Sequence, residues 1–296
     1  MQHVPVLLQE VMHALDPRPG DFMIDGTVDG GGHAAAVIRA IGPTGKFLGV
    51  DLDEAMLAEC RTRIPAQTGV TLRVGNYADL PEIVAREGSG RADGLLLDLG
   101  FSSEQLEHSG RGFSFSEASR NEPLLMTYDD ARTPVRDLLD RMPEREIADL
   151  IFRLGGERAS RRIARAIVAT RKRHRIGTSG ELADIVRGAL PKNYERGRID
   201  PATRTFQALR IAANGELENL GRILGSLGDL MAPGGRVAII TFHSLEDGTV
   251  KRSFRELART GEWELGTKKP VAPTREEIAQ NPRSRSAKLR TLIKKQ

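Results

Sequence analysis

The 296-residue sequence has a single cysteine, Cys60, and no long hydrophobic run. One thiol forms neither an internal disulfide nor a two-cysteine zinc or redox site, which suits the reducing cytoplasm. No stretch approaches the roughly 18 apolar residues that span a bilayer, and the opening MQHVPVLLQEV has no basic leader. These absences predict a globular cytoplasmic protein without a membrane anchor or a targeting signal.

The net charge is small as well, +4 from 44 basic and 40 acidic residues, but the basic residues are unevenly distributed. Nine basic residues and one acid lie between Arg153 and Arg175, and nine more follow from Lys268 onward against two acids. One such run is equally well explained by a solvated helix face or a charged tail. Two runs, with arginine dominating the first, favour a phosphate-rich partner.

Four short apolar runs predict strands in the first hundred residues, and amphipathic segments between them predict helices. Each run ends in an acidic or polar residue and is typical of a strand buried on both faces. The expected strands are 22–25, 46–51, 71–76 and 93–98, and the expected helices are 32–41, 54–64 and 79–86. This alternation predicts a doubly wound α/β sheet with a ligand at the carboxyl ends of its strands.

The alternation stops after the fourth strand. Between about residues 105 and 201 only helical patterns are evident, at 144–154, 157–172 and 180–190, the last opened by a possible capping box of Thr178 and Glu181. We therefore expect a discontinuous Rossmann-like domain of residues 1–106 and 205–296, interrupted by an all-helical substrate-recognition domain of residues 107–204.

The sheet is expected to resume near the end of the chain. A long helical stretch runs from Asp200-Pro201 towards Met231, and Pro233-Gly234-Gly235 turns it into a strand at 236–242. A helix at 245–258 and weaker strands at 263–267 and 289–293 complete the pattern.

A glycine-rich loop, Asp25-Gly26-Thr27-Val28-Asp29-Gly30-Gly31-Gly32-His33, joins the first expected strand to the first helix. Its glycines permit close approach of a ligand and a positive φ, although a purely structural turn also needs them. Asp51 ends the second expected strand, 19 residues after Gly32, where an acid in this topology accepts hydrogen bonds from ribose hydroxyls. Loop and acid together predict an adenosine-bearing cofactor.

The loop does not match the G-x-G-x-x-G pattern of nicotinamide dinucleotide sites. Asp25 and Asp29 would repel a pyrophosphate, and the insertion displaces the second mononucleotide-binding half that a dinucleotide needs. S-adenosylmethionine carries a sulfonium and an ammonium group, which Asp25 and Asp98 could face from adjacent strand ends. S-adenosylmethionine is therefore the preferred cofactor, and NAD is the alternative.

Eight segments resemble, in order along the whole chain, those of the bacterial 16S ribosomal RNA cytosine-N4 methyltransferase family. They are HVPVLLQEV (3–11), DGTVDGGGH (25–33), GLLLDLGFSSEQL (94–106), RGFSF (111–115), GGERASRRIARAIV (155–168), PATRTFQALRIAANGEL (201–217), GGRVAIITFHSLED (234–247) and NPRSRSAKLR (281–290). The resemblance implies a class I S-adenosylmethionine-dependent methyltransferase with a helical domain inserted after the fourth strand. It also implies methylation of the exocyclic N4 of a decoding-region cytidine in 16S ribosomal RNA.

The resemblance further implies a donor site, carried across residue by residue. Its members would be Gly31, Gly32, His33, Asp51, Tyr77, Asp98 and Gln105. Tyr77 would stack on or line the adenine, although an aromatic residue after a strand is more often part of the core. By pattern alone, His33 is an ordinary residue of a first helical turn.

Three positions depart from the family pattern. The family usually has glycine where Asp29 stands, a PLDMRMD-like run at 123–129, and arginine where Gly248 stands. Altered affinity, an altered substrate or an inactive paralogue are the alternatives that these departures raise.

Methyl transfer from a sulfonium is an in-line displacement that needs positioning rather than a covalent intermediate. The site must hold the amine with acceptors that favour a pyramidal nitrogen and receive its proton. The candidate catalytic residues are Asp98, Ser102, Ser103 and His243, the last close to Glu246 and Asp247. The segment from His243 also fits a helix N-terminus capped by Ser244. Cys60 is expected to be a packing residue, which argues against a mechanism through cysteine attack on the base.

The target base must be splayed from its stack, and basic residues of the insertion would hold the phosphates. We expect this role for Arg161, Arg162, Arg165, Arg171 and Arg173. The tail 281–290 could contribute likewise or return as an edge strand. The predicted function is thus a ribosomal RNA methyltransferase acting on the small ribosomal subunit without a metal. The alternatives are a non-catalytic ribosome-assembly factor and, less favoured, a nicotinamide-dependent oxidoreductase.

Overall fold

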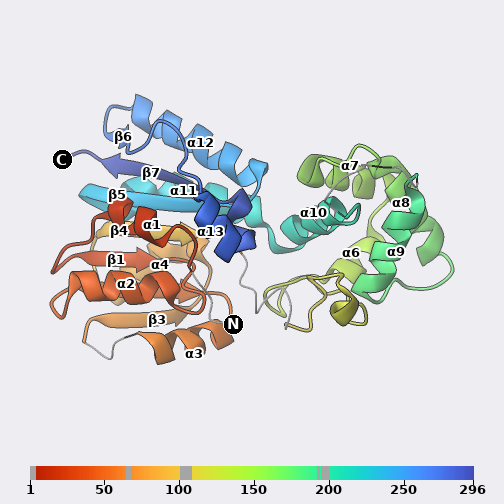
Figure 1. Ribbon diagram of the computed structural model, residues 1–296, viewed down its shortest axis with the longest axis horizontal. Coiled ribbons are helices and arrows are strands. Elements are labelled where there is room, and N and C mark those ends of the chain that lie inside the picture. Colours follow the sequence, from red (N-terminus) through yellow and green to blue (C-terminus); the bar gives the residue numbers. More distant parts are fainter. Residues whose placement is uncertain (1–4, 65–67, 101–108, 192–193, 195–199) are drawn as a thin grey trace. The chain divides into compact units, whose positions relative to one another are not determined.

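The computed structural model describes residues 5–64, 68–100, 109–191, 194 and 200–296. Its chain forms two compact units (Figure 1). The first comprises Met1–Gly100 and Leu217–Gln296, and the second comprises Phe101–Glu216. The predicted α/β fold is confirmed in the first unit, and the described part of the second contains helices and no strand.

A seven-stranded sheet with the order β3-β2-β1-β4-β5-β7-β6 forms the centre of the first unit. Its strands are β1 (Phe22–Asp25), β2 (Lys46–Asp51), β3 (Val70–Val74), β4 (Ala92–Asp98), β5 (Met231–Thr241), β6 (Trp263–Leu265) and β7 (Lys288–Lys294). Strands β1 to β5 pair in parallel, whereas β7 runs antiparallel to both of its neighbours. The carboxyl ends of β1, β2 and β4 therefore lie at one edge of the sheet and carry Asp25, Asp51 and Asp98.

Helices cover both faces of this sheet. The core on one face includes α1 (Leu8–Leu15), α2 (Gly32–Ile41) and α3 (Glu54–Arg63), and the core on the other includes α4 (Leu80–Glu87), α11 (Glu216–Leu230) and α12 (Ser244–Arg259). Successive strand residues alternate between the two cores, as Met23 and Ile24 do. Burial on both faces explains why these strands are continuous apolar runs.

The third strand departs from the predicted burial on both faces. β3 pairs only with β2 and forms an edge of the sheet, so Arg73 and Val74 are exposed. Asn76, predicted to end this strand, instead begins the next turn. Its side chain accepts a hydrogen bond from the backbone of Ala78 in the 3-10 helix η1 (Tyr77–Asp79).

The C-terminal segment is part of the sheet interior rather than an edge. β7 lies between β5 and β6, after α13 (Arg275–Gln280) and the 3-10 helix η3 (Pro282–Ser286). The predicted turn at Pro233-Gly234-Gly235 is a bulge within β5. The register jumps there from Ala92 opposite Met231 to Gly94 opposite Arg236, so five steps of β5 match two of β4.

The second unit packs its helices around a separate hydrophobic core. They are α6 (Val135–Arg141), α7 (Glu144–Gly155), α8 (Ser160–Arg171), α9 (Ser179–Ala189) and α10 (Thr203–Asn214), with the 3-10 helix η2 (Glu117–Ser119) before them. Thr178 caps α9 as predicted, since its hydroxyl accepts from the backbone of Glu181. Within the described residues, no helix is long and apolar enough to cross a bilayer.

The insertion ends later in the chain than the expected residue 204. The long helical stretch breaks at Gly215, which adopts φ 61° at the C-terminus of α10. α10 packs against α7 and contributes Phe206 and Leu209 to the core of the second unit. The chain therefore returns to the sheet unit only after Glu216.

Arg171 has a structural contact that its position in a basic run did not reveal. Its Nη1 donates to the backbone carbonyls of Leu139 and Met142, the latter at 2.7 Å. These carbonyls lie at the C-terminal end of α6, where helical partners are lacking. Arg171 therefore caps α6 through one nitrogen of its guanidinium, and its expected phosphate contact stays a prediction.

Substituting Arg171 should weaken the insertion. We expect Arg171→Ala to lower the free energy of unfolding by about 1–3 kcal/mol, because buried carbonyls lose their donor. Arg173→Ala, two residues away at an exposed position, should change it by less than about 0.5 kcal/mol. Urea denaturation, with hydrogen exchange of α6, measures both; equal effects of the two variants would exclude the capping role.

Candidate cofactor site and basic surface

The glycine-rich loop is fixed by the strands on either side of β1. The backbone NH of Gly26 donates to the carbonyl of Leu96 at 3.0 Å, and that of Val28 donates to Val50 at 3.1 Å. Gly31 precedes α2 with φ 84°, and a Cβ at this position would lie 2.8 Å from Sγ of Cys60. Only glycine satisfies both the left-handed backbone and the close approach.

Asp51 holds the loop from the end of β2. Its Oδ2 accepts from the backbone NH of Asp29 at 2.8 Å, and its Oδ1 accepts from that of Asp53 at 2.9 Å. A carboxylate offers about four acceptor positions, so both oxygens retain capacity for ribose hydroxyls. Asp51 is thus both an anchor for the loop and a candidate ligand.

The backbone conformation at Asp29 is one that glycine adopts more readily. This residue has φ 47°, in the left-handed region where glycine is favoured and aspartate is tolerated. An acid at this position adds a carboxyl group to the site at the cost of a less favourable backbone conformation.

Carboxyl groups accumulate at this edge of the sheet. Burial, helped by the charges of Asp98 and Asp51 and opposed by hydrogen bonds from Thr27, raises the pKa of Asp25 to about 8. Burial also raises the pKa of Asp29 to about 6, with a contribution from Asp98, and the pKa of Asp51 to about 6. Oδ2 of Asp25 is buried and has no hydrogen-bond partner among the described atoms. Such a cluster favours a cationic ligand and disfavours a phosphate.

Thr27 links two of these acids, and the sequence analysis did not single it out. Its hydroxyl donates to Oδ1 of Asp25 at 3.4 Å and accepts from the backbone NH of Asp98 at 2.6 Å. Oδ1 of Asp98 in turn accepts from the backbone NH of Gly100 at 3.2 Å. The only signal for Thr27 is its place in the glycine loop, because its partners lie on strands distant in sequence.

His33 and Tyr77 both lie beside the loop. Nε2 of His33 lies 3.0 Å from the carbonyl oxygen of Val6, and Nδ1 lies 3.8 Å from Oδ2 of Asp98. Tyr77 follows β3, and its Cβ would lie 2.9 Å from a Cβ at Gly26. The structure therefore brings both residues to the glycine loop, with His33 buried and Tyr77 half-buried.

Cys60 is a packing residue, as predicted. It is fully buried on α3, and burial raises the pKa of its thiol to about 12. A thiol with this pKa is protonated at neutral pH and is a poor nucleophile. Its side chain packs close to the loop, since a Cβ at Gly31 would lie 2.8 Å from its Sγ.

His243 is the N-cap of α12, rather than Ser244. Its Nδ1 accepts from the backbone NH of Glu246 at 3.4 Å, and Oε2 of Glu246 accepts from the backbone NH groups of Phe242 and His243. This capping box gives His243 and Glu246 structural partners at the carboxyl end of β5.

The neighbouring Asp247 is held by cations of β7. It accepts from Arg290 at 2.7 Å and from Lys288 at 3.3 Å. Burial acts to raise the pKa of Asp247, but the hydrogen bonds and charges of these two residues lower it overall. A Cβ at Gly248 would lie 3.3 Å from Nη1 of Arg252, so a guanidinium one turn later lies beside this position.

Ser102, Ser103 and Gln105 lie outside the residues that the structure describes. Their roles therefore stay predictions from the resemblance.

On the insertion, the predicted basic surface is exposed on α8 and just beyond it. Arg161, Arg162, Arg165 and Arg173 are exposed, and Arg165 lies 4.0 Å from Glu144. The opposite face of α8 packs into the core through Ile163, Ala164 and Ile167. The arginines are thus available to a partner, as their helical spacing predicts.

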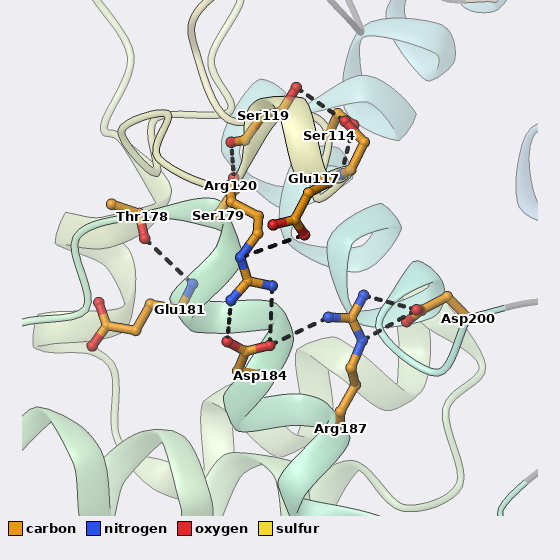
Figure 2. Close-up of polar contacts among 11 residues, drawn as sticks. Ser114, Glu117, Ser119, Arg120, Thr178, Ser179, Glu181, Asp184, Arg187 and Asp200 are labelled. Carbon is orange, nitrogen blue, oxygen red and sulfur yellow. Dashed lines mark hydrogen bonds and ion pairs between the residues drawn. The ribbon is translucent and has the colours of Figure 1, made fainter.

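In another part of the insertion, two arginines form ion pairs with acids of the same unit. Figure 2 shows Arg120 against Asp184 and Glu117, and Arg187 between Asp184 and Asp200. Hydrogen bonding by Arg120 is the main cause that holds the pKa of Asp184 below its usual value. Arg120 and Asp184 line a groove together with His174 and Glu181, so the charges in this groove are balanced, unlike those on the surface of α8.

A doubly wound sheet with a glycine loop and an acid on the second strand defines the class of Rossmann-like proteins that bind an adenosine-bearing cofactor. Within that class, the model of the MraW methylase family matches residues 1–295. The chain therefore belongs to the MraW methylase family, and it is a methyltransferase.

Curated relatives agree with this assignment over nearly their full length. The chain is 41% identical to Ribosomal RNA small subunit methyltransferase H of Syntrophobacter fumaroxidans, covering 99% of this chain and 97% of the relative. It is 43% identical to the protein of the same name from Syntrophus aciditrophicus, covering 98% and 96%. A similar solved structure is a putative rRNA-methylase from Clostridium thermocellum, with 10% identity, a TM-score of 0.47 and coverage of 100% and 99%. At this TM-score, the structural likeness adds no argument to the sequence relationship.

The raised pKa values predict how stability depends on pH. Asp25 is protonated in the folded protein up to about pH 8 but ionised above about pH 4 when unfolded. Its contribution to stability is therefore complete below about pH 4 and is lost as the pH rises through about 8. We expect the free energy of unfolding of the ligand-free protein to fall over this range, by roughly 1 kcal/mol per pH unit from this group.

Asp25→Asn should flatten the decrease between about pH 6 and 8, as measured by urea denaturation across a pH series. Asp53→Asn, at the N-cap of α3 where asparagine is an equally good cap, is the matched control. If Asp25→Asn leaves the slope unchanged, Asp25 is not the group that titrates.

Proposed function

We propose that this methyltransferase uses S-adenosylmethionine to methylate the exocyclic N4 of a cytidine in the decoding region of 16S ribosomal RNA. The observation that carries the proposal is the cluster of carboxyl groups around the glycine loop, in a chain that belongs to the MraW methylase family over its whole length. S-adenosylmethionine is the cofactor, and the relatives are named for the small-subunit ribosomal RNA that is the substrate.

The residues at this edge of the sheet fit a cationic donor. Asp51 would accept from the ribose, Tyr77 would line the adenine, and Asp98 would face the positively charged groups. Gly31 and Gly32 allow the loop backbone to approach the ligand, and His33 closes the site at the start of α2. Gln105 is assigned to this site by the resemblance alone.

The same cluster disfavours a nicotinamide dinucleotide. A pyrophosphate beside Asp25, Asp29 and Asp51 would place negative charges against carboxyl groups whose ionisation is already suppressed. A cationic ligand would instead neutralise the carboxylates. S-adenosylmethionine should therefore bind more tightly as Asp25, Asp29 and Asp51 ionise.

When bound, the cofactor supplies a methyl group on a sulfonium that is already a good leaving group. The protein must therefore orient the cytidine amine and receive its proton. Asp98 would take this role, which is supported by the position of its carboxylate at the end of β4 beside Thr27 and His33. Ser102, Ser103 and His243 are the further candidates, and His243 would act while capping α12.

Cys60 has no place in this chemistry. Its raised pKa and its complete burial leave no thiolate to attack the ring, in keeping with direct transfer to nitrogen.

The insertion would bind the RNA while the sheet edge selects the base. Exposed arginines Arg161, Arg162, Arg165 and Arg173 would hold phosphates, which position a strand without reading its sequence. The cytidine must leave its stack to reach a pocket. We place the reaction in the cytoplasm, on RNA within the small ribosomal subunit.

A catalytically impaired assembly factor is the second candidate, favoured by the unusual residues at 29 and 248. Nucleoside mass spectrometry of small-subunit RNA tests both functions. RNA from cells lacking the gene should lose N4-methylated cytidine, and the wild-type gene should restore it.

Asp98→Asn should restore at least 10-fold less modification than wild type, because the amine loses its charged acceptor. Cys60→Ala should restore it fully. Normal modification without the gene would support the assembly-factor alternative.

A separate prediction concerns the contribution of Asp51 to the binding of S-adenosylmethionine. Asp51→Ala should weaken the binding of S-adenosylmethionine by about 1–3 kcal/mol, because the ribose hydroxyls lose a charged acceptor. Isothermal titration calorimetry measures this, with Asp51→Asn as a variant that keeps one acceptor oxygen and Asp53→Asn as the control. Unchanged affinity in a folded Asp51→Ala protein would remove Asp51 from the site.

A further inference from the structure

Phe152 is an exposed aromatic residue on the insertion. It is 56% exposed, and among the described residues only Val74 is an equally exposed large hydrophobic side chain. The other described phenylalanines are buried or half-buried. Phe152 has no ring stacking or cation–π partner within the described part of the chain.

The helix explains which face Phe152 occupies. Ile147, Leu150 and Ile151 turn into the core of the insertion, whereas Arg145, Asp149 and Phe152 follow one another along the solvent face of α7. A residue at this position of an amphipathic helix is ordinarily polar. Phe152 therefore contributes nothing to the core that its helix builds.

The chain turns sharply just after Phe152. The carbonyl of Phe152 accepts from Gly156, whose φ of 65° ends α7, and α8 begins at Ser160 and packs against α7. The last turn of α7 and the first turn of α8 are thus joined by only four residues (Figure 1).

Exposed arginines dominate this corner of the insertion. They are Arg153, Arg158, Arg161, Arg162 and Arg165. The one exposed acid between residues 149 and 165 is Asp149, which lies 3.9 Å from Arg145. Glu157 is buried and is bound by Tyr194 and Arg204. The turn that follows Phe152 therefore carries more exposed arginines than acids, while Arg165, farther along α8, lies 4.0 Å from Glu144.

An exposed aromatic ring among arginines has the composition of a surface that binds unpaired nucleotides. Arginines contact the phosphates, while the ring offers a face on which a base stacks. We propose that Phe152 is a stacking platform for an unpaired base of the RNA substrate. This inference rests on the proposed function, since it assigns a residue that holds the same substrate.

The test separates base stacking from phosphate binding. Fluorescence anisotropy of the full-length protein would compare a short single-stranded RNA with an abasic strand of the same length and phosphate number. The wild-type protein should prefer the base-bearing strand, and Phe152→Ala should lose that preference through about a 10-fold weaker affinity for it. Its affinity for the abasic strand and its salt dependence should stay unchanged.

Three further variants make the result specific. Phe152→Trp should retain the preference, and its indole fluorescence should be quenched by the base-bearing strand. The triple variant Arg161→Gln, Arg162→Gln, Arg165→Gln should bind both strands more weakly. The slope of log affinity against log salt concentration should fall in magnitude by about 1 for each lost phosphate contact. Val74→Ala, on β3 of the other unit, is the control for loss of an exposed hydrophobic side chain.

Two results would overturn the stacking role. One is a wild-type protein without preference for the base-bearing strand, and the other is a folded Phe152→Ala protein that keeps the preference. Failure of the proposed function gives a different result. If cells show no cytidine methylation but the protein keeps a Phe152-dependent preference for the base-bearing strand, the proposed reaction is refuted and the stacking role is not.

Discussion

Burial of several carboxyl groups at one edge of a parallel sheet is the constraint on which the rest of this structure depends. Asp25, Asp51 and Asp98 end three neighbouring strands, and Asp29 joins them from the loop. Water is largely excluded, so each carboxylate must find hydrogen-bond donors or remain protonated. The backbone NH groups of the loop supply part of that need, which is why the loop is anchored to Asp51 and bridged by Thr27. In the proposed function a cationic cofactor would supply the remainder, so that loop geometry, pKa values and choice of ligand would have one cause.

Much of this arrangement could be predicted from the sequence, because it depends on local patterns. Apolar runs located β1, β2 and β4, and the acids after them were correctly expected at one edge of the sheet. The full extent of burial could not be predicted, since a run such as 71–76 has the same composition in a central strand and an edge strand. One continuous helical pattern spans α10 and α11 in the sequence, whereas the structure divides it at Gly215, which has φ 61° at the end of α10.

Residue roles that depend on distant partners were also beyond the sequence. Arg171 and Arg173 are two residues apart in one basic run, yet the first caps α6 and the second is exposed. His243 caps α12 in place of the serine that follows it, although serine is the usual N-cap. In each case the role of the side chain depends on a contact that forms only in the folded protein. Charge and spacing in the sequence identify an exposed basic surface, but they do not show which of its side chains already bind another part of the protein.

The position of β7 has a consequence for how the protein is made. This strand consists of residues 288–294, and it fills the space between β5 and β6. While the chain is being synthesised, the insertion leaves the ribosome before β5 does, and β5 has no antiparallel neighbour until β7 has followed it. The sheet unit therefore cannot complete its pairing until β7 has been translated, because β5 and β6 both pair with this later strand. The aspartate-lined edge thus belongs to a domain that completes its sheet late, whereas the helical insertion has all of its residues much earlier.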